Sequence, residues 1–357
     1  MNGNIFLKVD EFLTKGEHVV LARIISRKGS APRTVGSKCI ITGDGGIIGT
    51  IGGGFLEHMV REQAKEVLEK GKSCLYHFQL TGKDLSKADM LCGGVLDVYL
   101  DPLYPENRLT RALFNKIKEF LKTGRKGNLL TLISEGINAL DYDARMLIGQ
   151  DGSTEGALKG FSGDLEDLKK IKRPSLTEIA ETGAKIFVES IEPDAALFLF
   201  GAGHVSTFVS HLAKIVGFQV TVIDDRAEYA NRERFPEADE ILVVPFSQAL
   251  EYIQVTDNSY ITIITRGHIS DKTVLKSALQ TSPAYIGMIG SSRKRDQIYQ
   301  ALIKEGIPRE RLDEVHSPIG LDIKAETPEE IAVSIVAELI KARAESSRGV
   351  TAANAGN

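Results

Sequence analysis

The sequence predicts an α/β protein, with an N-terminal mixed α+β domain followed by a C-terminal domain built on a parallel β-sheet. Two domains are expected because the chain has 357 residues, whereas a single hydrophobic core stops growing at about 250–300 residues. The second half contains five nearly continuous apolar runs, which are typical of strands buried on both faces of a parallel sheet. The first half contains shorter apolar runs, two of them split by a glycine turn, around a helical pattern, which predicts a mixed α+β domain.

We expect the N-terminal domain to cover residues 1–192. Apolar side chains at helical spacing predict one helix from Phe55 to Leu68 and another from Leu109 to Leu121. Residues 150–175 are rich in glycine and charged side chains, so we expect a loop there. The remaining apolar runs predict strands at residues 18–27, 39–50 (two strands split by a Gly-Asp-Gly-Gly turn), 73–80, 95–101, 128–133, 143–149 and 184–191.

We expect the C-terminal domain to cover residues 193–345, where strands alternate with helical patterns. The last helix is predicted to begin with Thr327 as its N-cap, Pro328 at the first helical position and Glu330 completing a capping box. Residues 346–357 are small and polar without periodicity, which predicts a flexible tail. The strands are predicted at residues 196–200, 219–223, 240–244, 260–265 and 284–289.

Composition limits the classes of partner and the location of the protein. The net charge is −4 and the isoelectric point is near 6.0, so nucleic acid and anionic membranes are not expected as partners. No apolar stretch approaches the roughly 18 residues of a membrane span, and the start lacks a signal-peptide pattern. The three cysteines, Cys39, Cys74 and Cys92, form no CxxC pair. These features predict a cytoplasmic protein, and a homodimer is the commonest assembly for such a protein.

A phosphate-binding turn is predicted after the first strand of the C-terminal domain. Gly201 and Gly203 directly follow the apolar run at residues 196–200, and a helical pattern begins after them. Glycine permits a tight turn, while free N–H groups at the helix start attract a diphosphate. Asp224 ends the next strand, where a carboxylate can accept hydrogen bonds from a ribose. This is the pattern of a Rossmann-type domain, and it leaves the choice between NAD and NADP open.

Polar residues that follow other strands of the same sheet are candidates for the same site. Ligands of open parallel sheets bind beyond the carboxyl ends of the strands. A histidine placed there can donate a hydrogen bond to a phosphate, or act as an acid or base. Arg293, with its neighbour Lys294, is either a phosphate clamp or a solvated helix start. The candidates are His204 after the first strand, Arg266 and His268 after the fourth, and Ser291 and Arg293 after the fifth.

A second anion-binding site is predicted in the N-terminal domain. Gly52, Gly53 and Gly54 precede a predicted helix, so they expose backbone N–H groups at the positive end of a helix dipole. The loop lacks the GK[ST] ending of a P-loop, so nucleoside triphosphate hydrolysis is not indicated. Arg33 lies on a loop bounded by proline and glycine and is suited to an anionic group. Cys92 precedes two glycines, where a thiol can be exposed and reactive, and a buried thiol is the alternative.

Taken together, these segments resemble the XdhC/CoxI family, accessory proteins for the maturation of molybdenum hydroxylases such as xanthine dehydrogenase. The likeness covers nearly the whole chain. Two positions depart from the usual pattern: Ala31, where a serine is common, and Ser206, where alanine or glycine is common. The motifs that carry the likeness are GSAPRTVG, GTIGGGFLE and MLCGG in the first half, and FGAGHVS, VIDDR, ERFPEAD, TRGHISD, YIGMIGSSRKR and HSPIGLDI in the second.

The resemblance implies a protein that binds molybdenum cofactor (molybdopterin) and assists the sulfuration and insertion of that cofactor. A xanthine dehydrogenase-type enzyme would be the target, and a cysteine desulfurase a further partner. Cys92 would approach the metal or its sulfur. The chain lacks the iron–sulfur cysteine set of the redox enzyme itself, so it cannot be that enzyme alone. The resemblance favours a cofactor-binding chaperone over a catalyst. By motif, the cofactor-binding residues would be Gly52, Gly53, Gly54 and Cys92 in one half, and Gly201, Gly203, His204, Arg266 and His268 in the other.

Two other functions stay open from the residues alone. Gly201, Gly203 and Asp224, with His268 as acid or base, would suit an oxidoreductase that uses NAD or NADP. A protein-interaction module would instead tolerate substitution in the glycine loops. Binding of molybdenum cofactor or of a dinucleotide distinguishes these functions.

Overall fold

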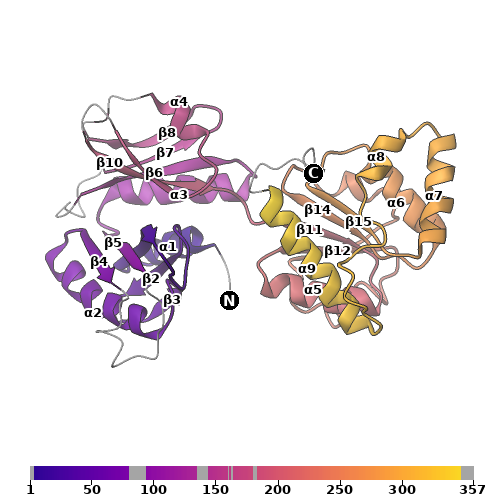
Figure 1. Cartoon of the computed structure of the whole chain (residues 1–357), viewed down its shortest axis with the longest axis horizontal. Coiled ribbons are helices and arrows are strands. Elements are labelled where there is room, and N and C mark those ends of the chain that lie inside the picture. Colours follow the sequence, from indigo (N-terminus) through magenta and orange to yellow (C-terminus); the bar gives the residue numbers. More distant parts are fainter. Residues whose placement is uncertain are drawn as a thin grey trace. The chain divides into compact units, whose positions relative to one another are not determined.

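The computed structural model describes residues 4–79, 94–134, 144–159, 161, 164–179 and 183–346. The chain divides into two compact units, one up to Pro193 and one from Asp194 onward (Figure 1). The first unit contains antiparallel sheets and the second a parallel sheet, which confirms the predicted fold class. Among the helices of the described residues, none has the length and apolar content of a membrane span. The predicted tail lies outside the described residues, apart from Ser346 at the end of the last helix.

In its described residues, the N-terminal unit forms two antiparallel sheets of five strands each. The strand orders are β3-β2-β1-β5-β4 and β8-β7-β6-β10-β9. The first sheet contains β1 (Val19–Lys28), β2 (Lys38–Thr42), β3 (Ile47–Gly49), β4 (Cys74–Gln79) and β5 (Val95–Leu103). The second contains β6 (Gly127–Ile133), β7 (Ala144–Gly149), β8 (Thr154–Leu158), β9 (Ser175–Glu178) and β10 (Lys185–Ile191). The predicted strands are confirmed, but the segment 150–175, which was expected to be a loop, contains β8 and α4 (Leu165–Lys169) and ends at the first residue of β9.

Helices α1 (Ile5–Thr14) and α3 (Arg108–Lys122) share one core with both sheets, in which Phe6 and Phe114 meet Leu21 and Leu129. On its other face the first sheet packs against α2 (Gly54–Lys70). This division follows from the alternation of side chains along each strand. No helix is expected from the sequence before residue 18, and the structure corrects this by showing α1. Its apolar positions Phe6, Val9 and Leu13 are all buried, as helical spacing requires.

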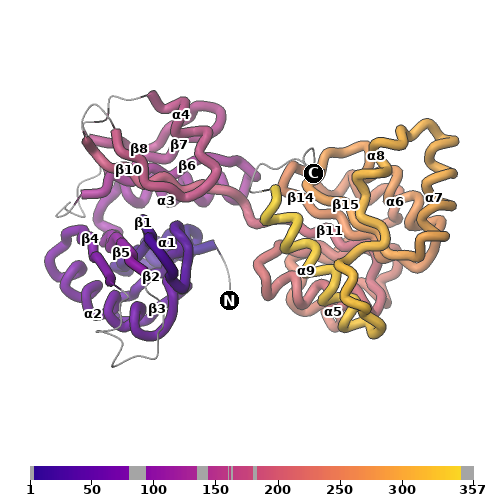
Figure 2. Tube along the Cα trace, viewed as in Figure 1, coloured from indigo at the N-terminus to yellow at the C-terminus, as the bar shows by residue number. Residues whose placement is uncertain are grey.

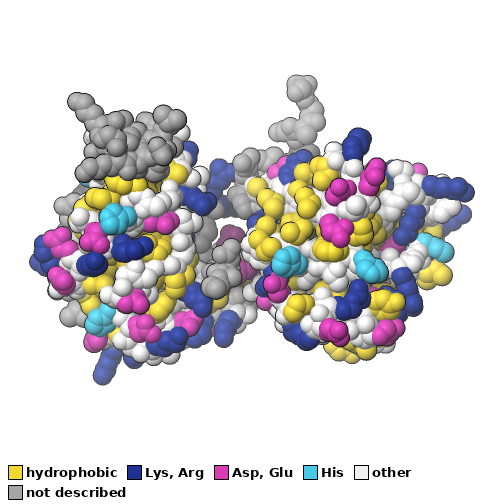
Figure 3. Space-filling view, turned by 90° about the horizontal axis from the view of Figure 1, so that it is seen from below, with side chains coloured by type: hydrophobic (Ala, Val, Ile, Leu, Met, Phe, Trp, Pro, Cys, Tyr) yellow, Lys and Arg dark blue, Asp and Glu magenta, His cyan; other side chains and the backbone are white. Residues whose placement is uncertain are grey.

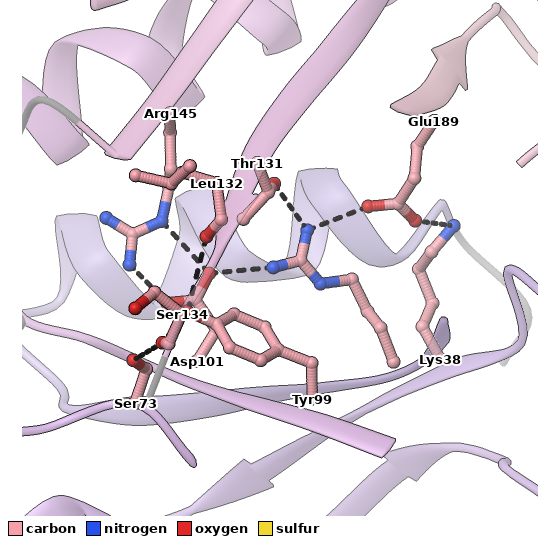
Figure 4. Close-up of polar contacts among 10 residues, drawn as sticks. Lys38, Ser73, Tyr99, Asp101, Thr131, Leu132, Ser134, Arg145 and Glu189 are labelled. Carbon is pink, nitrogen blue, oxygen red and sulfur yellow. Dashed lines mark hydrogen bonds and ion pairs between the residues drawn. The ribbon is translucent and has the colours of Figure 1, made fainter. Parts of the chain in front are cut away.

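A buried charge network joins the two antiparallel sheets (Figure 4). Arg23 of β1 donates hydrogen bonds to Asp101 of β5 at 2.9 Å and to Glu189 of β10 at 2.8 Å. Arg145 of β7 donates from Nε to Asp101 at 2.9 Å, and Lys38 pairs with Glu189 at 3.1 Å. Because an unpaired buried charge is very costly, each of these side chains depends on a partner in the neighbouring sheet. The network is not predicted, since a lone arginine within an apolar strand carries no periodic signal.

Within residues 194–346, the C-terminal unit forms a five-stranded parallel sheet in the order β13-β12-β11-β14-β15. The five predicted strands are confirmed. They are β11 (Ala196–Phe200), β12 (Gln219–Asp224), β13 (Glu240–Val243), β14 (Ser259–Ile263) and β15 (Tyr285–Met288). The helices are α5 (His204–Ile215), α6 (His268–Ala278), α7 (Ser292–Lys304), α8 (Arg309–Asp313) and α9 (Pro328–Ser346), with a short 3-10 helix, η2 (Ala249–Glu251).

Helices cover both faces of this sheet, which is why its strands are apolar throughout. Leu199 of β11 belongs to the core that contains Val209 of α5 and Ile335 of α9. Phe200, the next residue, belongs to the core that contains Val274 of α6 and the buried side chains of α7. Helix α9 lies beside α5 (Figures 1 and 2), although the two are far apart in the sequence.

The strand order places a topological switch point between β11 and β14. The chain passes from β11 to β12 on one side, and later returns to β14 on the other side. The following helices, α5 and α6, therefore pack on opposite faces of the sheet. In open parallel sheets the crevice beyond the carboxyl ends of the strands at such a point is the usual ligand site.

The N-terminus of α9 forms the predicted capping box. The N–H of Glu330 donates to Oγ1 of Thr327 at 3.3 Å, and the N–H of Thr327 donates to the Glu330 carboxylate at 3.2 Å. Both bonds satisfy backbone groups that the helix cannot satisfy itself.

Candidate functional site

The turn Gly201 to Gly203 lies at the carboxyl end of β11. Gly201 has a φ of 103°, and a Cβ added to it would lie 2.2 Å from the carbonyl oxygen of Ile264. No atom lies within 4 Å of a Cβ added to Gly203. Glycine is therefore required at 201 for backbone geometry and packing, whereas glycine at 203 leaves open space in front of the helix.

Asp224 holds this turn from the end of β12. Its carboxylate is 1% exposed and accepts a hydrogen bond from the N–H of Ala202 at 2.8 Å. The N–H and Nε of Arg226 donate to the same carboxylate at 3.1 and 2.9 Å. Burial raises the pKa of Asp224, but these hydrogen bonds outweigh burial and lower the pKa below its ordinary value. A ribose would have to displace Arg226 to reach this group, and ribose binding by Asp224 stays a prediction.

Arg234 holds the same turn through the carbonyl group of Ala202. Its Nη1 donates to the carbonyl oxygen of Ala202 at 2.8 Å, and its guanidinium lies 5.1 Å from the ring centre of Tyr229. The guanidinium of Arg226 lies over the same ring at 3.9 Å. These residues are not among the predicted site residues, although Arg234 belongs to the ERFPEAD segment. A loop arginine without a periodic pattern gives no sign of the backbone group that it will bind.

Two helices begin at this edge without a side-chain cap. Helix α5 has Gly203 as its N-cap and α6 has Gly267, and neither cap supplies a side-chain hydrogen bond. The predicted residues His204 and His268 are the first residues of these helices, and both are exposed. Because β11 and β14 are neighbours, two positive helix ends lie on the two sides of the switch point. This arrangement is suited to a ligand with negative charge.

Arg266 lies at the same edge and is exposed. Its Nη2 lies 3.9 Å from Oδ2 of Asp225. Asp225 follows β12 and Arg266 follows β14, so this pair spans the end of β11. An exposed pair at this distance contributes little stability, which leaves Arg266 free to exchange Asp225 for an anionic ligand.

Two of the residues after β15, Ser291 and Lys294, make contacts that stabilise the fold. The Ser291 hydroxyl accepts a hydrogen bond from the N–H of Lys294 at 3.3 Å and so caps α7. Lys294 forms an ion pair with Asp271, a fully buried carboxylate that also accepts a bond from Thr265. Arg293 is exposed at the first turn of α7. Ligand contacts by Ser291 and Arg293 stay predictions.

In the N-terminal unit, the predicted glycine loop packs against the predicted arginine loop. Gly52 has a φ of 133°, and a Cβ added there would lie 2.8 Å from Cγ of Pro32 and 3.4 Å from Cγ of Arg33. A Cβ added to Gly94 would lie 2.3 Å from the carbonyl oxygen of Ser30. The structure thus brings together parts of the three N-terminal motifs. Cys92 lies outside the described residues.

The start of α2 is open in the same way as those of α5 and α6. Gly53 is the N-cap of α2 and gives no side-chain bond, and both Gly53 and Gly54 are exposed with no atom within 4 Å of an added Cβ. The carboxylate of Glu57 turns back and accepts a bond from Oγ1 of Thr50 at 2.6 Å. The backbone N–H groups at this helix start remain accessible to an anion.

Another thiol of the described residues, that of Cys39, lies near the glycine loop, because Cys39 of β2 pairs with Gly49 of β3. Cys39 is buried, and burial, with a smaller effect of Glu57, raises the pKa of its thiol to about 12. Among the described residues, no group of three or more His, Cys, Asp or Glu side chains could hold a metal ion. A hollow of about 650 Å³ beside Phe12 and Asp44 belongs to a different part of the N-terminal unit.

The five-stranded parallel sheet, with a glycine turn at its switch point, defines the second unit as a Rossmann-type domain. The family description "XdhC Rossmann domain" matches residues 197–339, and "XdhC and CoxI family" matches residues 12–79. The chain belongs to the XdhC and CoxI family, as its motifs predict.

The chain is similar over nearly its whole length to several known proteins. It is 28% identical to a probable xanthine dehydrogenase subunit of Bacillus subtilis (strain 168), over 96% of this chain and 98% of that protein. It is 21% identical to the molybdenum cofactor insertion chaperone PaoD of Escherichia coli (strain K12), over 93% of this chain and 86% of that protein. A crystal structure described as a xanthine dehydrogenase from Bacillus halodurans has a TM-score of 0.80 and 26% identity, over 99% of this chain and 98% of that chain.

Proposed function

We propose that this protein binds molybdenum cofactor and assists the sulfuration and insertion of that cofactor into a xanthine dehydrogenase-type molybdenum hydroxylase. The observation that carries the proposal is the pair of uncapped helix starts, at Gly203 and Gly267, on the two sides of the switch point. Relatives described as a molybdenum cofactor insertion chaperone and as a probable xanthine dehydrogenase subunit support the choice of cofactor and target.

In the C-terminal unit, the starts of α5 and α6 beyond the carboxyl ends of β11 and β14 would hold the phosphate of the cofactor. Backbone N–H groups at the starts of α5 and α6 are donors with a favourable dipole. His204, His268 and Arg266 are exposed beside them and can add hydrogen bonds and charge. The turn itself is already held by Asp224 and Arg234, so little ordering is needed when a ligand binds.

The N-terminal loops would form an anion-binding site within their own unit. Gly53 and Gly54 supply open N–H groups, and Arg33 lies beside Gly52. The cofactor would supply a metal with sulfur ligands when bound, and a thiolate of this chain would be the group that approaches this metal. We assign that role to Cys92, because a soft thiolate suits this metal and because the motif of Cys92 ends at Gly94, which packs against Ser30.

In this role the protein acts as a chaperone of the cofactor more than as a catalyst. A cysteine desulfurase would supply sulfur. Cys92 in the N-terminal unit and His268 in the C-terminal unit are the two candidate reactive groups, each considered within its own unit. The setting would be cytoplasmic, which agrees with three widely spaced cysteines that form no CxxC pair.

The alternative is an oxidoreductase that uses NAD or NADP, which the Rossmann-type turn favours. The contacts of Asp224 weigh against it, because Arg226 and Ala202 already use the carboxylate that a ribose would need. Titration of the purified protein with each dinucleotide tests this alternative. Saturable binding with turnover would favour the oxidoreductase over the chaperone.

Cofactor binding to the full chain tests the proposal. Wild-type protein mixed with molybdenum cofactor should give a stoichiometric complex, and Cys92→Ala should weaken it. Cys74→Ala is the matched control, since Cys74 lies in β4 as a partly buried thiol. Equal binding by wild type and Cys92→Ala would remove the proposed role of Cys92, and a wild type that binds no cofactor would remove the proposed function.

A further inference from the structure

The outer face of α9 carries an apolar stripe. Val333 is 50% exposed and Ile340 is 40% exposed, and Ala337 lies between them. Their spacing of four and three residues places all three on one side of the helix. The opposite side of α9, which includes Ile335 and Leu339, is already buried in the core of the unit. A helix with apolar side chains on both sides usually packs against protein on both sides.

Charged side chains of opposite sign stand at the two ends of this stripe. Glu329 lies at the N-terminal end and Lys341 at the C-terminal end, and both are exposed. Neither forms an ion pair with another of the described residues. The stripe is therefore acidic at one end, apolar in the middle and basic at the other end.

This pattern is complementary to itself when reversed. We propose that α9 is the interface of a homodimer, in which two copies of the chain pair antiparallel about a two-fold axis beside Ala337. With Val333 of one copy over Ile340 of the other, Lys341 of one copy comes within about one helical turn of Glu329 of the other. A parallel pairing would instead place like charges together. A two-fold contact of this kind closes on itself, so it gives dimers and no larger assembly.

Exposed apolar residues next to both ends of α9 extend the surface. Ile323 is 49% exposed, and its loop is bound to α9 because the Ser334 hydroxyl donates to the carbonyl of Leu321 at 2.6 Å. Ile215 is 53% exposed beside Val216, whose carbonyl accepts a bond from Arg343 at 3.0 Å. Figure 3 shows that hydrophobic side chains are exposed on the face of this unit that it draws. A stable interface buries about 800 Å² per partner. We therefore include Ile323 and Ile215 in the proposed surface.

Analytical ultracentrifugation of the full chain tests the interface. Wild-type protein is expected to be a dimer at about 100 µM and to dissociate on dilution toward about 1 µM, as befits a small interface. Val333→Glu and Ile340→Glu should each weaken the dimer by at least about tenfold, since they bury a charge at the centre of the contact. Ile303→Glu is the matched control, because Ile303 of α7 is 42% exposed on the same unit; this variant should dimerise as wild type does.

A charge exchange tests the antiparallel register. Glu329→Lys and Lys341→Glu should each weaken the dimer, and the double variant should restore it, because the two charges meet only across the two-fold axis. Circular dichroism of each variant separates loss of the dimer from loss of folding. A wild type that stays monomeric at about 100 µM, a dimer that persists in correctly folded Val333→Glu, or a double variant weaker than both single variants would each overturn the proposal.

Discussion

The carboxylate of Asp224 and the N–H of Ala202 are joined by a hydrogen bond of 2.8 Å, which ties the end of β12 to the glycine turn after β11. Arg234 binds the carbonyl of the same residue at 2.8 Å. Both polar groups of the central turn residue are thus used by the protein itself. The N–H groups left for a ligand are those at the start of α5, and the turn that presents them is formed in advance.

Asp224→Ala is therefore expected to destabilise the C-terminal unit. The change leaves the N–H of Ala202 and the guanidinium of Arg226 without their acceptor, at a cost of about 1–3 kcal/mol in the free energy of unfolding. Urea-induced unfolding measures this. Asp225→Ala, which removes an exposed carboxylate, should change stability by less than about 0.5 kcal/mol. Equal stability of the two variants would show that Asp224 does not hold the turn.

The two glycines of the turn are expected to differ. Gly201→Ala should lower the melting temperature, because its backbone has a positive φ and the added Cβ meets the Ile264 carbonyl. Gly203→Ala should lower the melting temperature much less, since the φ of Gly203 is negative and no atom lies within 4 Å of the added Cβ, which leaves only the weaker preference for alanine as a helix N-cap. Differential scanning calorimetry of both variants checks this, and the reverse order of stability would contradict the described turn.

Arg23→Met should strongly destabilise the N-terminal unit. The variant removes the guanidinium partner of the buried carboxylates of Glu189 and Asp101, although Asp101 keeps its pair with Arg145. Breaking such a buried pair costs about 3–5 kcal/mol. Arg27→Met is the control, as Arg27 is an exposed residue of the same strand. Chemical denaturation followed by circular dichroism compares the two. A loss below about 1 kcal/mol for Arg23→Met would mean that the network contributes little.

The same network predicts how stability depends on acid. Burial raises the pKa of Glu189, but the charges of Lys38 and Arg23 outweigh burial and lower the pKa below its ordinary value. A group with a lowered folded pKa stabilises above its unfolded pKa, about 4.3 for Glu, and loses this effect as pH falls toward the folded pKa. Glu189→Gln should therefore be less stable than wild type at pH 7, and its stability should fall less steeply below about pH 4.5. Parallel slopes for the two proteins would contradict the assignment.

The fold of the C-terminal unit could be predicted because each of its elements carries a local signal. Strands buried on both faces need continuous apolar runs, as at residues 196–200, and the cap of α9 needs the pattern at Thr327 and Glu330. The N-terminal unit was predicted less completely. Strand β8 is short and lacks a continuous apolar run, so its local pattern is weak. Helix α1 does carry a local signal, namely Phe6, Val9 and Leu13 at helical spacing after Asn4 as N-cap, so it could have been predicted.

The candidate site was predicted at the level of its backbone turns and less well for its side chains. A glycine before a helix indicates an open helix start from local sequence alone, and this holds at Gly53, Gly203 and Gly267. The partner of a polar side chain depends on tertiary structure. For this reason the contacts of Asp224 with Arg226 and of Arg234 with Ala202 could not be read from spacing.

Equilibrium binding of molybdenum cofactor to the full chain and to Gly203→Val tests the central claim most directly. A valine at this position closes the open space before α5 and should hinder a phosphate from reaching the N–H groups of the helix. We expect one cofactor per wild-type chain and at least about tenfold weaker binding to a Gly203→Val variant that keeps the wild-type circular dichroism spectrum. Equal affinity of the two folded proteins would contradict the claim that this helix start holds the cofactor.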